Sequence, residues 1–187
     1  RQRVVLNGSE SSWEGVTSSV VQGSVLGPLL FLMYINCLDL AIKSSDDSIL
    51  VSKYADDTKL GRAIADVNDC MKLQTAANNL VSWCNDWGMS LHPEKCVVLH
   101  FGRNNPNQAY FIGQQQLNAV PYAKDLGVII SNTCESSLHI DKITKSAHAV
   151  LSQVHRAIHL RDSHTFLTIY KSFVRPLLES AAPAWNP

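Results

Sequence analysis

Apolar and polar residues recur along the chain with two different periods, and each period predicts a different kind of element. Short runs rich in strand-favouring residues, bounded by turn residues, predict β-strands. These runs cover residues 4–6, 13–17, 49–54, 58–60, 95–101, 110–112 and 125–130. The strand signals stop near residue 130, so we expect the strands of this protein to lie before that point.

Two helices are predicted within the same region. One begins at Gly27-Pro28, because proline is well tolerated in the first turn of a helix. The apolar residues 29–35 cover every side of this helix, which predicts burial on nearly all sides. The other helix runs from Asp66, a typical N-cap residue, to Gly88, a typical C-terminal cap. Its apolar residues recur every three or four positions, so one face should pack on a core.

From about Leu138 the pattern becomes purely helical. The apolar face of a first helix carries residues 140, 143, 147, 150, 151, 154 and 158. At 100° per residue the basic side chains group opposite, at Lys142, Lys145, His148, His155, Arg156 and His159. Ser163 is predicted to cap a second helix with an apolar face of Phe166, Ile169, Phe173 and Leu177. The fold class is therefore predicted as α+β, with a mixed body in residues 1–130 and a helical segment in residues 131–187.

Charge is distributed unevenly along the 187 residues, although the net charge is zero. Residues 1–141 carry ten basic and fourteen acidic side chains, whereas residues 142–175 carry six basic side chains and one acid. An apolar content of 45% allows a real core and excludes wholesale disorder. The basic face of the helical segment is either an ordinary solvated surface or a contact surface for a polyanion.

Cysteine usage and hydropathy bear on the compartment. The five cysteines are odd in number and irregularly spaced, which predicts buried free thiols in a reducing compartment and an intracellular location, nucleus or cytoplasm. The longest apolar run, residues 29–35, is far shorter than the ~20 residues of a membrane helix, so no membrane partner is expected. No zinc is expected from Cys84, His92, Cys96 and His100, because Pro93 prevents a helix that would align them.

The sharpest candidate site is Tyr54-Ala55-Asp56-Asp57, between two predicted strands. Neighbouring side chains of a strand point to opposite faces, but a tight hairpin turn can bring both carboxylates toward one side. Two carboxylates so close repel each other unless a cation neutralises the pair. Hard oxygen ligands suit Mg²⁺. The alternative is a solvated Asp-Asp turn, since Asp favours turns.

Four blocks in this order resemble the palm of reverse transcriptases, in particular those of non-LTR, LINE-type retrotransposons. The blocks are Gln22-Gly23…Pro28-Leu29-Leu30-Phe31, Tyr54-Ala55-Asp56-Asp57, Trp87…Leu91-His92-Pro93-Glu94-Lys95-Cys96 and Leu126-Gly127-Val128. The first two blocks together are highly specific. The resemblance implies a palm of antiparallel sheet with packed helices in residues 1–130 and a thumb-like helical segment in residues 131–187.

The resemblance also implies an RNA-directed DNA polymerase that binds an RNA template, a DNA primer and dNTPs. The catalytic residues would be Asp56, Asp57 and Lys95, with Asp56 and Asp57 holding Mg²⁺, or Mn²⁺ as a substitute. The residues that bind nucleotide and template would be Gln22, Gly23 and Tyr54. The primer end would be supported by Leu126 and Gly127. The nucleic-acid backbone would be contacted by Lys142, Lys145 and Arg156.

Several positions depart from the family pattern. Val21 stands where proline is usual, and Ser19 stands where glycine is usual. The block with the family's third catalytic carboxylate is expected before Arg1, so residues 1–187 would be a C-terminal palm and thumb fragment. Two alternatives stay open: the palm of an RNA-dependent RNA polymerase, and a catalytically inactive truncated remnant that at most binds nucleic acid.

Ordinary structural roles are also available to the same residues. Gln22-Gly23 is then a loop before a helix, and Lys95 is a solvated lysine at the start of a strand. Leu126-Gly127 is then a bend within one strand. Trp83 and Trp87 continue the apolar stripe of their helix, which favours core packing over base stacking.

Overall fold

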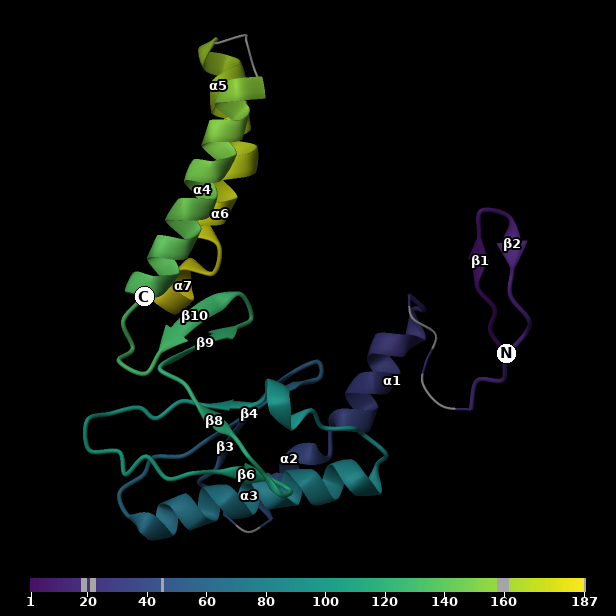
Figure 1. The fold of residues 1–187 in the computed structure, drawn as a ribbon, viewed down its shortest axis with the longest axis vertical. Helices are drawn as coiled ribbons and strands as arrows, with labels where there is room; N and C mark the ends of the chain where they lie inside the picture. Colours follow the sequence, from purple (N-terminus) through teal and green to yellow (C-terminus); the bar gives the residue numbers. More distant parts are fainter. Residues whose placement is uncertain (18–19, 21–22, 45, 158–161, 187) are drawn as a thin grey trace. The chain divides into compact units, whose positions relative to one another are not determined.

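The computed structural model describes residues 1–17, 20, 23–44, 46–157 and 162–186 (Figure 1). It consists of two compact units, residues 1–90 and 91–187. Helices and short strands occur in both units, which confirms the predicted mixed α+β class. The described strands form five separate two-stranded sheets, four antiparallel and one parallel. The predicted boundary near residue 130 falls inside the second unit and stays a prediction.

The first unit begins with a small hairpin. Its elements in chain order are β1 (Val5–Leu6), β2 (Ser9–Glu10), α1 (Leu26–Ile35), α2 (Leu38–Lys43), β3 (Leu50–Tyr54), β4 (Asp57–Gly61) and α3 (Val67–Asp86). β1 and β2 pair across a two-residue turn at Asn7-Gly8. The guanidinium carbon of Arg3 lies 4.7 Å from the ring centroid of Trp13, and Arg3 also forms an ion pair with Glu10.

The core of the first unit lies where α2 packs on α3. α3 begins with a reciprocal capping box, in which the Asp66 carboxylate accepts from the Asp69 N–H and the Asp69 carboxylate accepts from the Asp66 N–H. The predicted apolar face of α3 is confirmed at Cys70, Leu80 and Cys84, which are buried together with Ala76 and Trp83. α2 contributes the fully buried Leu38 and Ile42.

Helix α1 contradicts the prediction of burial on nearly all sides. Its buried residues are Gly27 and Ile35, whereas Leu29, Leu30, Leu32 and Met33 are 46–68% exposed. The helix is held at its C-terminal turn, where Tyr34 packs edge-on against Trp83 and Trp87 and donates its hydroxyl to the Trp87 carbonyl oxygen at 2.7 Å. Apolar residues on every side make burial favourable, but they supply no neighbour to pack against.

The stretch of residues 26–43 is long and apolar enough to cross a membrane by length and composition alone. This is weak evidence, because core helices and signal sequences pass the same test. In the structure the stretch forms two helices, α1 and α2, separated at Asn36-Cys37. Leu38 and Ile42 of the second helix belong to the core of the unit.

The second unit combines short strands with a pair of helices. Its elements are η1 (Pro93–Lys95), β5 (Val97–Val98), β6 (Phe111–Ile112), β7 (Gln115–Gln116), β8 (Asn118–Ala119), β9 (Tyr122–Asp125), β10 (Val128–Ser131), α4 (Ser137–Ala157), α5 (Ser163–Ile169), the π-helix η2 (Tyr170–Val174), α6 (Arg175–Glu179) and α7 (Ala182–Trp185). Of the strand predicted over residues 95–101, the described structure keeps only β5. Pro93 starts a 3₁₀ turn that includes Lys95, so the strand begins later than predicted. β5 pairs in parallel with β8.

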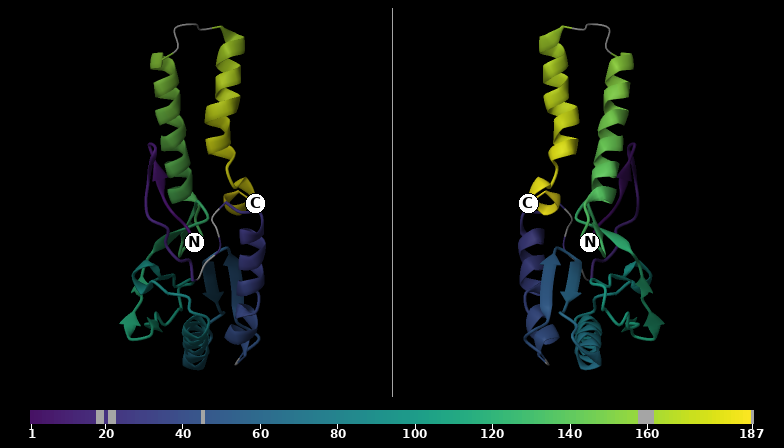
Figure 2. Two further views of the ribbon diagram at one scale, coloured as in Figure 1. Left: turned by 90° about the vertical axis from the view of Figure 1, so that its right-hand side faces the viewer. Right: turned by 90° about the vertical axis from the view of Figure 1, so that its left-hand side faces the viewer.

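Helix α4 packs along η2 and α6, and Figure 2 shows the two helical stretches running side by side within this unit. Ile143 and Ala147 of the predicted apolar face of α4 are buried, but Ile140 is 42% exposed. The N-cap of α5 is Asp162 rather than the predicted Ser163, since the Asp162 carboxylate accepts from the Thr165 N–H at 2.8 Å. The burial of the apolar side chains in this stretch also differs from the prediction.

The π-helix explains the difference at Phe173, whereas Phe166, which precedes the π-helix, is 53% exposed against the prediction. Phe173 is 62% exposed, whereas the next residue, Val174, is fully buried. A π-turn contains one residue more than an α-turn, so it rotates every following side chain by about one position around the axis. The regular α spacing assumed for residues 166–177 therefore fails at Phe173. The extra residue of the π-turn places Val174 in the core instead.

Candidate active site

The Asp56-Asp57 pair lies at the tip of the β3–β4 hairpin, as the sequence predicted. Tyr54 pairs with Asp57 in the antiparallel register, so Ala55 and Asp56 form a two-residue turn. Both carboxylates and the Tyr54 side chain are exposed, and Tyr54 keeps 64% of its surface. The hairpin thus presents two acidic side chains to solvent on adjacent residues.

The turn carries an unusual backbone conformation. Ala55 has a φ of 52°, a left-handed value that costs a residue with a Cβ about 1 kcal/mol. Such residues cluster at functional sites, where the surrounding structure holds them in place. In this protein β3 and β4 hold the turn from both sides through five paired positions.

The donor chemistry of this tip fits a divalent metal ion of the Mg²⁺ type. Asp56 and Asp57 offer hard carboxylate oxygens, and their exposure leaves room for the waters and phosphates that Mg²⁺ keeps as ligands. Within the described part of the chain, no three His, Cys, Asp or Glu side chains group closely enough to hold a metal ion. Two carboxylates offer fewer oxygen atoms than the octahedral coordination of Mg²⁺ requires, so a metal site at this tip would need further ligands.

Lys53 anchors the hairpin to the corner between α1 and α2. Its ammonium group forms an ion pair with Asp39 at 2.8 Å and donates to the carbonyl oxygen of Ile35 at 3.0 Å. The Lys53 side chain is only 17% exposed. These partners are distant from Lys53 in the sequence, and no local pattern in the chain indicated the contact.

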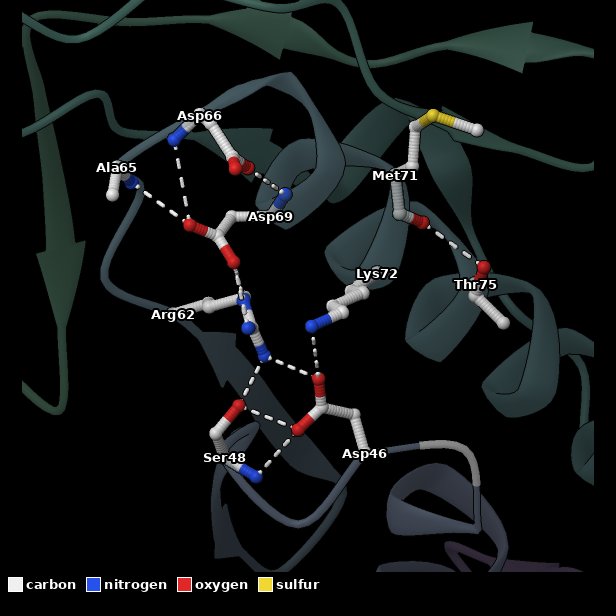
Figure 3. A network of polar contacts seen from close by, with 9 residues as sticks. All are labelled: Asp46, Ser48, Arg62, Ala65, Asp66, Asp69, Met71, Lys72 and Thr75. Atoms are coloured by element: carbon white, nitrogen blue, oxygen red, sulfur yellow. Dashed lines mark hydrogen bonds and ion pairs between the residues drawn. The ribbon is translucent and has the colours of Figure 1, made fainter.

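A charge network holds the base of the same hairpin (Figure 3). Arg62, which follows β4, donates to Asp46 at 2.7 Å, to Asp69 at 2.7 Å and to the Ser48 hydroxyl. Asp69 belongs to the capping box of α3, and Lys72 lies 3.5 Å from Asp46. The network therefore ties the loop before β3, the end of β4 and the start of α3 together. No local pattern in the sequence indicated this role of Asp46, because its partners come from separate segments of the chain.

Hydrogen bonds and charges of the network lower the pKa values of its two carboxylates, Asp46 and Asp69. The side-chain and backbone hydrogen bonds from Ser48, with the charges of Arg62 and Lys72, hold the pKa of Asp46 well below its usual range. The Ala65 N–H and the Arg62 guanidinium lower the pKa of Asp69. A depressed folded-state pKa contributes stability that is complete above the ordinary Asp pKa of about 3.9 and disappears as pH falls through the folded value.

Replacing Arg62 by methionine should therefore destabilise the chain in a pH-dependent way. Near pH 7 the variant should unfold at lower urea concentration than the wild type, because two ionised carboxylates lose their partner. The difference between the two proteins should shrink as pH falls below about 4, where protonation weakens the network in the wild type as well. Urea titrations at both pH values measure this, and an equal difference at both would contradict the assignment.

The other predicted site residues occupy separate places. Gln22 lies outside the described residues, as do Val21 and Ser19. Gly23 is exposed with a φ of 82°, a conformation that favours glycine, and no atom lies within 4 Å of where a Cβ would be. Lys95 is exposed at the end of η1, in the second compact unit. The roles predicted for Gly23 and Lys95 stay predictions.

Leu126 and Gly127 form the two-residue turn of the β9–β10 hairpin. Asp125 pairs with Val128, which corrects the interpretation of residues 125–130 as one bent strand. Both turn residues have positive φ, 44° for Leu126 and 95° for Gly127, as a type I′ turn requires. Lys142 of α4 donates to the Gly127 carbonyl oxygen at 3.1 Å.

The basic face of α4 is confirmed as a solvent-facing surface over the described part of the helix. Lys145, His148, His155 and Arg156 are exposed, whereas Lys142 is half-buried, and His159 lies outside the described residues.

The cysteines of the chain are all free thiols. Cys70 and Cys84 are buried as predicted, but Cys134 is exposed. Cys96, which is half-buried, donates its thiol to the His92 carbonyl oxygen.

Comparison with known proteins gives one family. Residues 3–130 match the profile described as reverse transcriptase (RNA-dependent DNA polymerase). The chain is 24% identical over 183 residues to the RNA-directed DNA polymerase from mobile element jockey of Drosophila melanogaster, covering 94% of this chain and 20% of that protein. It is 26% identical over 186 residues to the probable RNA-directed DNA polymerase from transposon X-element of the same species, with the same coverage.

A third relative extends the same result. The probable RNA-directed DNA polymerase from transposon BS of Drosophila melanogaster is 23% identical over 179 residues, covering 90% of this chain. The chain spans about a fifth of the length of these relatives, 20% in each case. No solved structure gives a significant match.

Proposed function

The chain belongs to the reverse transcriptase (RNA-dependent DNA polymerase) family, and we propose that it carries part of the catalytic site for RNA-templated DNA synthesis. Its relatives are the polymerases of jockey, X-element and BS, which confirms the predicted relationship to non-LTR retrotransposons. The observation that carries the proposal is the exposed Asp56-Asp57 pair on a hairpin turn, inside the region that matches the family. The five free thiols support an intracellular location, nucleus or cytoplasm.

Asp56 and Asp57 are the proposed ligands for divalent metal ions. Bound Mg²⁺ or Mn²⁺ would stabilise the charge on the attacking primer oxygen and on the leaving pyrophosphate. The two carboxylates would hold the metal ions at the hairpin tip. Lys95 would donate a proton to the pyrophosphate. Tyr54, Gln22 and Gly23 would contact the nucleotide and template. Leu126 and Gly127 would support the primer end.

Primer extension by a chimera tests this function. In the chimera, this chain replaces the matching segment of the jockey polymerase, and the unmodified jockey protein serves as the positive control. We expect addition of dNTPs to a DNA primer on an RNA template. Extension with NTPs alone would support an RNA-dependent RNA polymerase. A folded chimera that binds primer–template without extending it would support the inactive remnant.

The 187-residue chain by itself is expected to show no measurable extension. Mg²⁺ dehydrates reluctantly and relies on carboxylates plus substrate phosphates, so two carboxylates would hold it weakly. Positioning of the nucleotide by the rest of a polymerase domain can supply about 7–11 kcal/mol of barrier reduction. The assay uses a primed template with dNTPs and Mg²⁺ or Mn²⁺. Extension that disappears on Asp56→Asn would show that this chain holds a complete site.

The exposed basic residues of α4 are proposed to contact the phosphate backbone of the primer–template. Changing Lys145 and Arg156 together to glutamine should weaken binding and reduce the log–log salt slope by about 1.8, because each neutralised duplex phosphate accounts for about 0.9. Fluorescence anisotropy at several salt concentrations measures both. Arg103→Gln, at an exposed loop position of the same unit, serves as the control. An unchanged slope would mean that this face is only solvated.

A further inference from the structure

Two side chains of α4 reach the backbone of the β9–β10 hairpin. Lys142 donates from its Nζ to the Gly127 carbonyl oxygen at 3.1 Å, and the Ile129 N–H donates to Nδ1 of His139 at 3.3 Å. His139 and Lys142 are three residues apart, so they lie on neighbouring positions of the helix surface. One hydrogen bond therefore holds the turn itself, and the other holds the strand two residues after it.

The bond to His139 closes the free edge of β10. In an antiparallel pair, hydrogen-bonded and non-hydrogen-bonded residue pairs alternate. Asp125 and Val128 flank the two-residue turn as a hydrogen-bonded pair, so Ile129 and Lys124 form the next, non-hydrogen-bonded pair. The Ile129 N–H thus points away from β9, toward the place where a further strand would pair. His139, only 3% exposed, occupies that place.

This arrangement determines which nitrogen of His139 carries the proton. Nδ1 must be unprotonated to accept the Ile129 N–H, so the neutral ring carries its proton on Nε2. A tilted contact with Trp185, with ring centroids 5.8 Å apart, orients the ring further. The side chain is thus a fixed acceptor on α4 for one particular backbone amide.

Lys142 bonds to the backbone of the hairpin, and in this it differs from Lys145, the other lysine of the helix. Lys145 is exposed, whereas Lys142 is half-buried and has its ammonium group on the Gly127 carbonyl oxygen. The turn residues Leu126 and Gly127 both need left-handed φ, so a bond to their backbone stabilises a conformation that Leu126 disfavours. Lys142 is therefore placed to hold the turn.

We propose that His139 and Lys142 are positioning residues that fix the Leu126–Gly127 turn to α4, so that the turn and the helix move as one body. Its consequence rests on the proposed function: a primer end supported by the turn would stay at a constant place relative to the helix that contacts the primer–template. The proposal separates Lys142, which positions the turn, from Lys145 and Arg156, which face solvent.

Amide hydrogen exchange of the 187-residue chain, followed by NMR, tests the role of Lys142. Lys142→Gln should speed exchange of the Val128 and Ile129 amides about tenfold, the effect of removing one hydrogen bond to a charged group. Lys145→Gln, the matched change one helix turn away, should leave both amides unchanged. In the anisotropy assay the effects should be reversed, because only Lys145→Gln should lower the salt slope, by about 0.9.

Histidine variants test the second contact. His139→Leu removes the acceptor and should expose the Ile129 amide to exchange, whereas His139→Asn should restore protection, because its Oδ1 can take the place of Nδ1. At mildly alkaline pH the ¹⁵N spectrum of the wild type should show an unprotonated Nδ1 and a protonated Nε2. The opposite tautomer, or equal protection of Ile129 in the Leu and Asn variants, would overturn the role of His139.

The outcomes separate this proposal from the proposed function. Exchange and tautomer are measured without nucleic acid, so they decide the positioning role even if the chain binds no primer–template. If Lys142→Gln leaves the exchange of Val128 and Ile129 unchanged, the role of Lys142 is overturned. If positioning holds and no primer–template is bound, the proposed function fails by itself.

Discussion

Replacing Asp56 by asparagine is expected to slow primer extension by the jockey chimera at least about a thousandfold. The change removes one negative charge from the proposed metal ligands, and charge stabilisation by bound metal is worth several kcal/mol, at about 1.4 kcal/mol per factor of ten. Asp56 lies exposed in a turn, so the protein should keep its fold. Single-turnover extension rates, with circular dichroism as the folding check, measure the effect.

Two further variants make this result specific. Asp47→Asn alters another exposed aspartate of the same unit and should leave the extension rate within about twofold of the wild type. Asp57→Asn should be milder than Asp56→Asn. An Asp56→Asn protein that keeps more than a tenth of the wild-type rate would contradict the assignment of Asp56 as a metal ligand.

Replacing Ile42 by alanine is expected to lower the free energy of unfolding of the chain by about 2–5 kcal/mol. Ile42 is fully buried where α2 packs on α3, so the smaller side chain leaves a cavity as well as losing buried apolar surface. Asn79 of α3 also donates to the Ile42 carbonyl oxygen at 3.4 Å, which keeps the two helices in contact around any cavity. Urea denaturation followed by tryptophan fluorescence measures the loss.

The same helix provides the control. Leu40 lies two residues before Ile42 and is 77% exposed, so Leu40→Ala should change the free energy of unfolding by no more than about 0.5 kcal/mol. Equal losses for the two variants would mean that α2 does not pack on α3 through Ile42.

Local sequence signals predicted the elements whose causes are local. α3 was predictable from Asp66 to Gly88, because capping residues and a repeat of three or four residues act within the helix itself. The β3–β4 hairpin was predictable for the same reason, since two strand-favouring runs flank a short polar break. The exposure of α1 was not predictable, because burial depends on neighbours that the local pattern does not specify.

The candidate site likewise has features that the sequence predicts and features that it does not. Adjacent carboxylates and their turn were visible in the sequence, but the residues that hold the hairpin were not. Lys53 bonds to Ile35, and Arg62 joins Asp46 to Asp69, through contacts between separate segments. A sequence offers many such charged pairs, and only the folded backbone selects among them. The contact between Lys142 and Gly127 belongs to the same class.

The π-helix of residues 170–174 has a consequence for how this region should be compared with related sequences. The half-buried residues up to and including its first position are Thr165, Ile169 and Tyr170, and those that follow Val174 are Leu177 and Leu178. Each group fits a regular helix, but the two groups differ in phase by about one residue, as an inserted residue produces. A gapless alignment of this region to a relative with an uninterrupted helix would therefore pair core positions with solvent-facing ones on one side of Phe173. A single-residue gap within residues 170–174 restores the correspondence on both sides.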